Sequence, residues 1–151
     1  MRNNYIIIAV IVLFYLLFKK VKMKYPIIIP FRITSKYGNR KHPVSGNISF
    51  HNGIDIAVPI GTHIINPYNG VVKNINTHST GGKQLIIQHD NGFTTGYAHL
   101  ENNSFFQIGD KVKQGEVIAT TGNTGISTGP HLHLTLRKDG VLVNPESYFN
   151  V

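Results

Sequence analysis

The chain has 151 residues and no cysteine, and its 15 basic and 7 acidic residues give a formal net charge of +8. This length is sufficient for one domain with a buried core. The absence of cysteine excludes a disulfide framework, a thiolate metal site and a cysteine nucleophile, so any bound metal must be held by histidine and carboxylate.

The N-terminal 24 residues differ in composition from the rest. An unbroken apolar run covers residues 5–18, and four lysines follow it before residue 25. The run is shorter than the roughly 20 residues of a membrane-spanning helix, but lysine side chains can snorkel and extend the span. No small-residue cleavage site follows, so residues 1–24 are predicted to be an uncleaved transmembrane anchor in a lipid bilayer, with a basic flank, rather than a signal peptide.

The positive charge is concentrated in this N-terminal segment. It contains five basic residues and no acidic one, which leaves 10 basic and 7 acidic residues, a net charge of +3, for the remainder. A domain this weakly basic lacks the electrostatic footprint of a nucleic-acid-binding protein, so we expect no nucleic-acid partner. The lysines are better explained as a juxtamembrane cluster beside anionic lipid headgroups.

Residues 25–33 are expected to form a linker or a first edge strand, because their two prolines limit strand pairing. From residue 34 to 151, short apolar stretches alternate with glycine and asparagine, and no segment keeps a helical period over three turns. Asp90-Asn91-Gly92 and Lys138-Asp139-Gly140 each separate two such stretches and predict hairpins. We therefore predict an all-β domain over residues 34–151, an antiparallel β-sandwich or barrel-like fold.

His131-Leu132-His133 is the clearest chemical pattern. Alternate residues of a strand project from the same face, so both imidazoles are predicted to point to one side. Such a pair can supply two metal ligands, or one ligand and one proton-transfer group; surface histidines on a strand are the plain alternative.

His51-Asn52-Gly53-Ile54-Asp55 is a second, weaker pattern. In a flat strand, His51 and Asp55 would lie roughly 13 Å apart, but a turn at Asn52-Gly53 could bring them together. An imidazole nitrogen and a carboxylate oxygen both suit Zn²⁺. Two polar residues that merely border a turn would give the same pattern.

The remaining histidines carry less signal. His99 lies between apolar neighbours at the end of a predicted strand and, without context, is best explained as a buried core histidine. The other four lie beside proline, glycine, serine or a hairpin turn, which favours exposed or locally bonded side chains: His42, His63, His78 and His89. The glycine-rich loop over residues 122–130 lacks the lysine of a phosphate-binding loop and is expected to form a wall beside the site.

Taken in order, these patterns resemble the LytM/lysostaphin-type zinc endopeptidases, peptidase family M23. The resemblance covers residues 34–149, and its specificity comes from the order of the blocks rather than from any one of them. The blocks are Tyr37-Gly38-Asn39-Arg40-Lys41-His42-Pro43, His51-Asn52-Gly53-Ile54-Asp55, Asn69-Gly70-Val71-Val72, Tyr97-Ala98-His99-Leu100, Gly109-Asp110-Lys111-Val112 and Ser127-Thr128-Gly129-Pro130-His131-Leu132-His133.

The resemblance implies one Zn²⁺ per chain, with His51, Asp55 and His133 as ligands and with His131 and His99 as the catalytic pair. It also implies an all-β fold with a groove and, as substrate, the stem or cross-bridge peptides of bacterial peptidoglycan. Because residues 44–50 contribute few groove-lining groups, the choice between glycine bridges and stem bonds stays open.

Four lysines follow the apolar run and one arginine precedes it, which by the positive-inside rule places the domain in the cytoplasm, whereas a cell-wall hydrolase should face outward. A lysin in a phage virion membrane that acts during phage entry would resolve this conflict. The rivals are a membrane-anchored remodelling enzyme of the bacterial envelope and a non-catalytic module that binds peptidoglycan or activates another hydrolase. Retention of all five metal and catalytic positions favours an enzyme.

Overall fold

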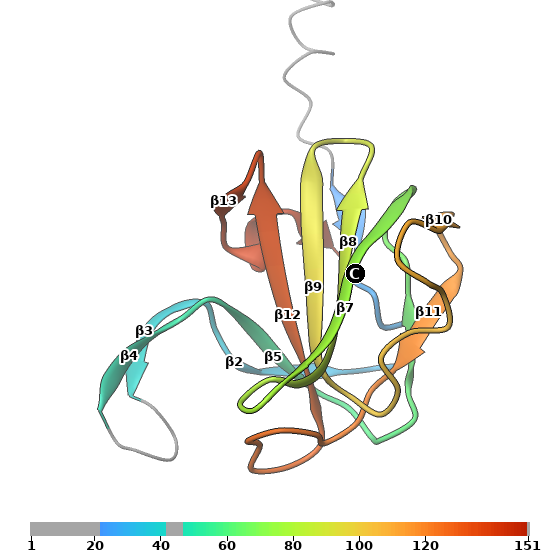
Figure 1. The fold of residues 1–151 in the computed structure, drawn as a ribbon. Coiled ribbons are helices and arrows are strands. Elements are labelled where there is room, and N and C mark those ends of the chain that lie inside the picture. The colour runs from blue at the N-terminus through green and yellow to red at the C-terminus, as the bar shows by residue number, and fades with distance from the viewer. Residues whose placement is uncertain (1–21, 42–46, 151) are drawn as a thin grey trace, which may run out of the picture.

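The computed structural model describes residues 22–41 and 47–150, which form strands connected by turns and loops (Figure 1). Within these ranges there is no α-helix, and the one helical element is a short 3₁₀ turn, η1 (Pro145–Ser147). The all-β prediction is therefore confirmed for the described part of the chain. The expected anchor over residues 5–18 lies outside it, and no helix in the described ranges is long and apolar enough to cross a membrane.

The largest sheet is antiparallel throughout and carries the predicted hairpins. Asp90-Asn91-Gly92 connects β8 to β9, and Asp139-Gly140 connects β12 to β13 (Val141–Leu142). In spatial order, the strands of this sheet are β10 (Lys111–Val112), β7 (Gly70–His78), β8 (Gly82–His89), β9 (Phe93–Leu100), β12 (His131–Lys138), β5 (Gly53–Ala57) and β2 (Arg32–Ser35), with β13 paired to β12.

Alternation along β12 divides this sheet into a buried face and an open face. Leu132, Leu134 and Leu136 are fully buried, whereas His131 and His133 are only partly covered on the opposite side. This is the period-two pattern of a half-buried strand. The core therefore lies on one face of the sheet, and chemically active side chains are left on the other.

A second layer covers the buried face. The two-stranded sheet of β6 (His63–Ile65) and β11 (Val117–Thr120) contributes Ile64 and Ile118, both fully buried in the same hydrophobic cluster as the β12 leucines. Burial of apolar surface of this kind is the main stabilising term of a small domain.

The segment expected to be basic flank and linker is part of this core. Met23 and Ile27 are buried in the hydrophobic cluster, and β1 (Met23–Lys24) pairs in parallel with β14 (Phe149–Asn150). The folded domain therefore includes residues from Met23 onward rather than from residue 34, because the apolar side chains of this segment cover the core.

A separate hairpin projects from the main sheet beside its open face (Figure 1). It consists of β3 (Gly38–Lys41) and β4 (Ile48–His51), which, among the strands of the described ranges, pair only with each other. His51 is the last residue of this hairpin, and after one intervening residue the chain enters β5 of the main sheet.

Candidate metal centre

Asn52 is the point at which the chain leaves one sheet and enters another. His51 ends β4, which pairs with β3, whereas β5 begins at Gly53 and pairs with β2 and β12. This change of partners brings the His51 imidazole back over the strand that follows it, with Nε2 at 3.2 Å from Oδ1 of Asp55. The predicted convergence of His51 and Asp55 is therefore present in the fold.

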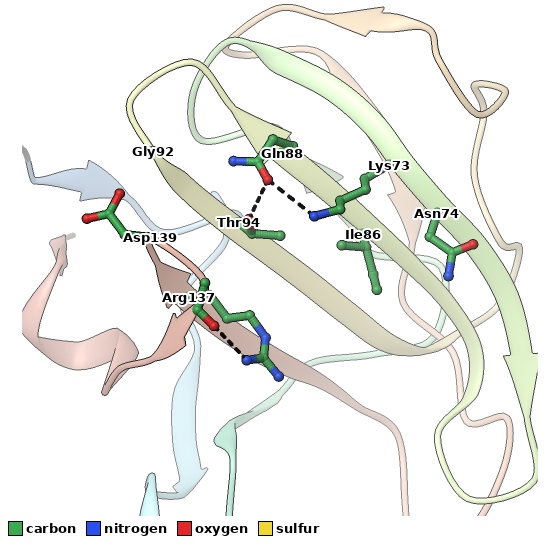
Figure 2. A pocket seen from close by; sticks show the side chains of 9 residues that line it. Lys73, Asn74, Ile86, Gln88, Gly92, Thr94, Arg137 and Asp139 are labelled. Carbon is green, nitrogen blue, oxygen red and sulfur yellow. Dashed lines mark hydrogen bonds between the residues drawn. The ribbon is translucent and has the colours of Figure 1, made fainter.

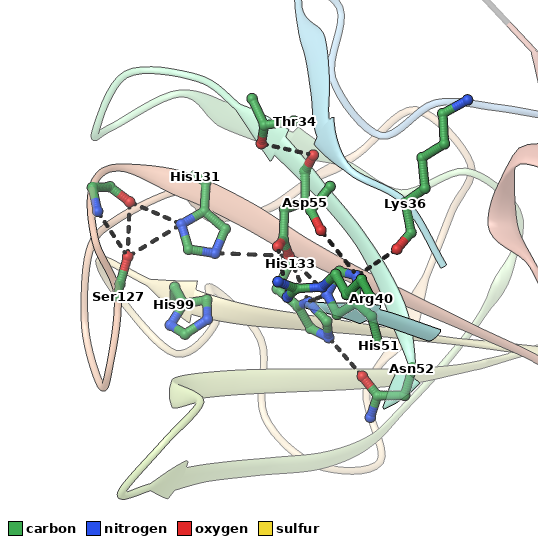
Figure 3. A network of polar contacts seen from close by, with 12 residues as sticks. Thr34, Lys36, Arg40, His51, Asn52, Asp55, His99, Ser127, His131 and His133 are labelled. Atoms are coloured by element: carbon green, nitrogen blue, oxygen red, sulfur yellow. Dashed lines mark hydrogen bonds and ion pairs between the residues drawn. The ribbon is translucent and has the colours of Figure 1, made fainter. Parts of the chain in front are cut away.

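His133 joins them through strand register. It lies directly opposite Asp55 in the antiparallel pair of β12 and β5, on the same open face. Nδ1 of His133 is 2.8 Å from Asp55 Oδ1 and 3.1 Å from His51 Nε2. Three potential ligand atoms from two imidazoles and one carboxylate thus meet at one point (Figure 3).

The partners of the outer ring nitrogens explain why these atoms meet. His51 donates from Nδ1 to the backbone carbonyl of Lys36 at 2.8 Å, and His133 donates from Nε2 to Oδ1 of Asn52 at 3.0 Å. Each bond leaves the other ring nitrogen with a lone pair, and these lone pairs face each other and a carboxylate oxygen. Three electron-rich atoms this close together are suited to bind a cation between them.

The donor set and its spacing fit zinc. Tetrahedral zinc at about 2.0–2.2 Å from nitrogen and oxygen ligands requires donor atoms roughly 3.3 Å apart, and the three separations here are 2.8–3.2 Å. Backbone and side-chain acceptors on the outer nitrogens are the usual second layer around ligating histidines. Three protein ligands also leave one tetrahedral position open, which is typical of catalytic rather than structural zinc sites.

The Asp55 carboxylate is held in its ionised form. Burial alone would raise its pKa, but when no cation is bound the His133 and His51 imidazoles can instead donate hydrogen bonds to this carboxylate, and these bonds and the accompanying Coulomb attraction outweigh burial and hold the pKa far below its usual range. Its second oxygen faces the Arg40 guanidinium at 3.5 Å. An anionic ligand is therefore ready at neutral pH.

His131 and His99 lie beside this cluster, with their ring centroids 4.5 Å apart. His131 donates from Nδ1 to the carbonyl of Gly129 at 2.8 Å, and His99 donates from Nδ1 to the carbonyl of Thr124 at 2.7 Å. Both acceptors belong to the loop expected to be a wall, and both bonds leave Nε2 as the free nitrogen. Nε2 of His131 is 3.8 Å from Asp55 Oδ1.

His99 reaches the open face through an irregularity in β9. Regular alternation after Tyr97, which is buried, and Ala98, which lies opposite His133, would turn His99 toward the core. The β8–β9 register instead contains a bulge here, and His99 has a positive φ of 60°. Bulges commonly redirect a side chain beside a functional site. Burial lowers the pKa of His99, although its bond to Thr124 partly opposes this.

The cavity around the five residues has a volume of about 610 Å³. One wall comes from the β3–β4 hairpin and the other from residues 126–128 of the glycine-rich loop, as expected. The sequence predicted no chemical role for the lining residues Arg40, Asn52 and Gln84, nor for Lys36, whose carbonyl accepts from His51. Arg40 and Asn52 lie within the motifs that carry the family resemblance, and this position in the motifs could have marked them as residues of the site.

The other histidines that the structure describes do not join the site. His63 and His78 are exposed, as expected, and His42 lies outside the described residues. His89 differs from the prediction because it is buried, donating from Nδ1 to the carbonyl of Tyr68 and accepting at Nε2 from the Thr95 hydroxyl. Burial lowers its pKa.

Comparisons with known proteins agree with this geometry. Residues 49–145 match peptidase family M23. The chain is 41% identical over 122 residues to the peptidoglycan DD-endopeptidase ShyA of Vibrio cholerae, covering 80% of this chain and 28% of that protein. It is 43% identical over 116 residues to the DD-carboxypeptidase/endopeptidase Mpg of Neisseria meningitidis, covering 77% and 26%. The chain thus spans about a quarter of the length of these curated relatives.

Solved structures share the fold. A zinc-containing peptidase from Vibrio cholerae superposes with a TM-score of 0.75 at 36% identity, covering 83% of this chain and 40% of that one. The catalytic domain of lysostaphin from Staphylococcus simulans gives a TM-score of 0.69 at 27% identity, covering 78% and 91%. With a family match over most of its length and an intact His-Asp-His cluster, the chain belongs to peptidase family M23.

Proposed function

We propose that this chain is a zinc-dependent endopeptidase that hydrolyses peptide bonds of bacterial peptidoglycan. The observation that carries the proposal is the meeting of His51 Nε2, Asp55 Oδ1 and His133 Nδ1 within 2.8–3.2 Å of one another. The presence of His131 and His99 beside this cluster favours an enzyme over a non-catalytic binding module. The endopeptidase activities for which ShyA and Mpg are named support peptidoglycan as the substrate.

A zinc ion bound by His51, Asp55 and His133 would polarise the scissile carbonyl and lower the pKa of the attacking water. The protein's own contribution lies in His131 and His99. We assign proton acceptance from the water to Nε2 of His131, because the bond from Nδ1 to Gly129 fixes the ring and leaves Nε2 basic.

Because Nδ1 of His99 already donates to Thr124, its Nε2 would first have to accept a proton, for which the proton taken from the water by His131 is the source, and could then donate to the oxyanion or to the leaving amine. Its bond to the Thr124 carbonyl holds the ring at the cavity, and its contact with His131 places the two proton-transfer groups side by side. The loop over residues 122–130 thereby orients both rings through backbone carbonyls.

The test is digestion of purified peptidoglycan by the protein, with and without a chelator, followed by mass analysis of the products. Peptide fragments should appear, and chelation should abolish their release while added zinc restores it. The His131→Ala variant should retain zinc and lose turnover by about 10²–10⁴-fold. Release of the same fragments in the presence of chelator would refute the zinc mechanism.

We further propose that residues 5–18 anchor the enzyme in a membrane, in the bacterial envelope or in a phage virion. The unbroken apolar run and the basic flank support this proposal. A tag at Val151 and protease treatment of intact cells or virions would determine the exposed side. A tagged protein recovered wholly without membranes would refute the anchor.

A further inference from the structure

A second polar cavity, of about 760 Å³, lies over the same sheet that carries the metal centre. Four neighbouring strands each contribute a polar side chain to it: Lys73 from β7, Gln88 from β8, Thr94 from β9 and Arg137 from β12 (Figure 2). Neither the family motifs nor the proposed chemistry uses any of these four residues.

The cavity lies on the open face of the sheet, in line with the metal centre. Along β12, His131, His133, Thr135 and Arg137 alternate with the buried leucines and therefore share one face. Arg137 is four residues beyond the ligand His133, so the two lie roughly 13 Å apart along the strand. This distance equals about four residues of an extended peptide.

The cavity presents two cations without an anionic partner. Among the described residues, every ion pair involves Asp55, so neither Lys73 nor Arg137 is paired there. Asp139 also lines the cavity, but its carboxylate lies apart from the Arg137 guanidinium (Figure 2). The two cations can therefore bind an external anion without breaking an existing ion pair.

Neutral contacts hold both cations toward the cavity. Arg137 donates from Nη1 to the carbonyl of Gly140 at 2.9 Å, which orients the guanidinium, and no other acceptor among the described residues occupies its remaining donors. Lys73 Nζ is 3.5 Å from Oε1 of Gln88, which also accepts a hydrogen bond from the Thr94 hydroxyl at 3.0 Å. A planar guanidinium and an ammonium group are each suited to bind a carboxylate.

Small residues form the floor between the two sites. Gly96 on β9 and Gly53 on β5 both lie opposite Thr135, and Ala98 lies opposite His133. A Cβ atom at Gly96 would be 2.5 Å from Oγ1 of Thr135, so the short Thr135 side chain covers this glycine and no larger side chain rises from the floor here. An extended peptide can therefore lie across the sheet from the metal centre to Arg137.

We propose that Arg137 and Lys73 bind a carboxylate of the peptide substrate about four residues from the bond that is cleaved. This inference rests on the proposed function, because it takes the metal centre as the position of that bond. A peptide is favoured over a phosphate-bearing polymer, because the floor and the spacing match an extended chain. The residues would act on substrate affinity and selectivity rather than on the chemical step.

The test compares purified muropeptides with the same muropeptides after their carboxylates have been coupled to ammonia, which converts them to carboxamides. Binding to the full chain is measured by titration calorimetry, so the readout does not depend on turnover. We expect the carboxylate form to bind about two- to fivefold more tightly, the usual range for an exposed ion pair. Arg137→Gln and Lys73→Gln should each reduce this preference and leave carboxamide binding unchanged.

Lys113→Gln is the matched control, because it removes one exposed charge in the turn after β10, outside both cavities, and should keep the full preference. Equal binding of the two forms, or an unchanged preference in Arg137→Gln, would overturn the subsite even if turnover is normal. If the carboxylate form binds more tightly but no muropeptide is cleaved, the subsite is supported and the proposed catalysis is refuted. If Arg137→Gln weakens the binding of poly(glycerol phosphate) but not that of the muropeptides, the peptide assignment is overturned.

Discussion

Replacement of Gly53 by alanine should damage the metal centre without touching a ligand. A Cβ atom at this position would be 2.4 Å from the carbonyl oxygen of Leu134 and 3.0 Å from Cε1 of His133. Real Cβ contacts essentially never fall below 3.0 Å, so the first contact is too short by 3.0 minus 2.4, or about 0.6 Å. Because this oxygen belongs to the Leu134 backbone and cannot rotate away as a side chain could, β5 and β12 must move apart.

This movement acts on the two strands that carry Asp55 and His133, which lie opposite each other two residues from Gly53. Overpacking of this kind typically lowers the free energy of unfolding by about 1–3 kcal/mol. Displacement of ligand-supporting structure typically weakens metal binding about 10–100-fold. We expect Gly53→Ala to show both effects, measured by urea unfolding of the metal-free protein and by zinc titration against a chromogenic chelator.

Gly129→Ala is the control, because a Cβ atom there meets nothing within 4 Å and its backbone needs no positive φ. It should match the wild type in zinc affinity and in the urea midpoint. A Gly53→Ala protein with wild-type zinc affinity and wild-type stability would refute the reasoning, because the strands would then tolerate the added methyl group.

Three further predictions follow from buried or supporting side chains. Burial lowers the pKa of His89, so its contribution to stability is present above its unfolded pKa of about 6.5 and is lost as the pH falls through the folded value. The urea midpoint should therefore decrease as the pH is lowered from about 7 to about 5. The His89→Gln variant should show a smaller decrease. Leu134→Ala removes a fully buried side chain and should lower the free energy of unfolding by about 2–5 kcal/mol, seen as a lower urea midpoint. Asn52→Ala removes the acceptor of His133 Nε2 and should weaken zinc binding about tenfold by chelator titration; unchanged affinity would show that this bond does not orient the ligand.

The local parts of the fold could be predicted from the sequence. Period-two alternation around His131-Leu132-His133 assigned both histidines to one face, and the turn residues at Asp90–Gly92 located a hairpin. These signals depend on neighbours a few residues apart. They are therefore readable before any tertiary contact is known.

The assembly of the centre could not be predicted from spacing. His133 and Asp55 are 78 residues apart and meet only because β12 pairs with β5 in one register. A shift by one residue would turn His133 to the other face. Only the resemblance to a family linked these residues before the fold was known. The contact of His51 with the Lys36 carbonyl involves the backbone, so the identity of residue 36 could not predict it.

The position of His99 could not be predicted from the alternation of buried and exposed residues along its strand. The apolar neighbours of this residue favoured a core position, and the side chain is buried as expected. The bulge in β9 nevertheless directs it to the site, where its ring contacts that of His131. A bulge adds one residue to one strand, and this sequence has no glycine at the positive-φ position to mark it.

The parallel pair of β1 and β14 has a consequence for the order of folding. Met23 donates its amide to the carbonyl of Tyr148, and Tyr25 donates to that of Asn150, so the pairing joins residues more than a hundred positions apart. Closing so large a loop carries a high entropic cost. Because β14 is synthesised after every other strand, β1 remains without its partner until translation has passed Asn150. Until then, the strand pairing beside the buried Met23 side chain is missing.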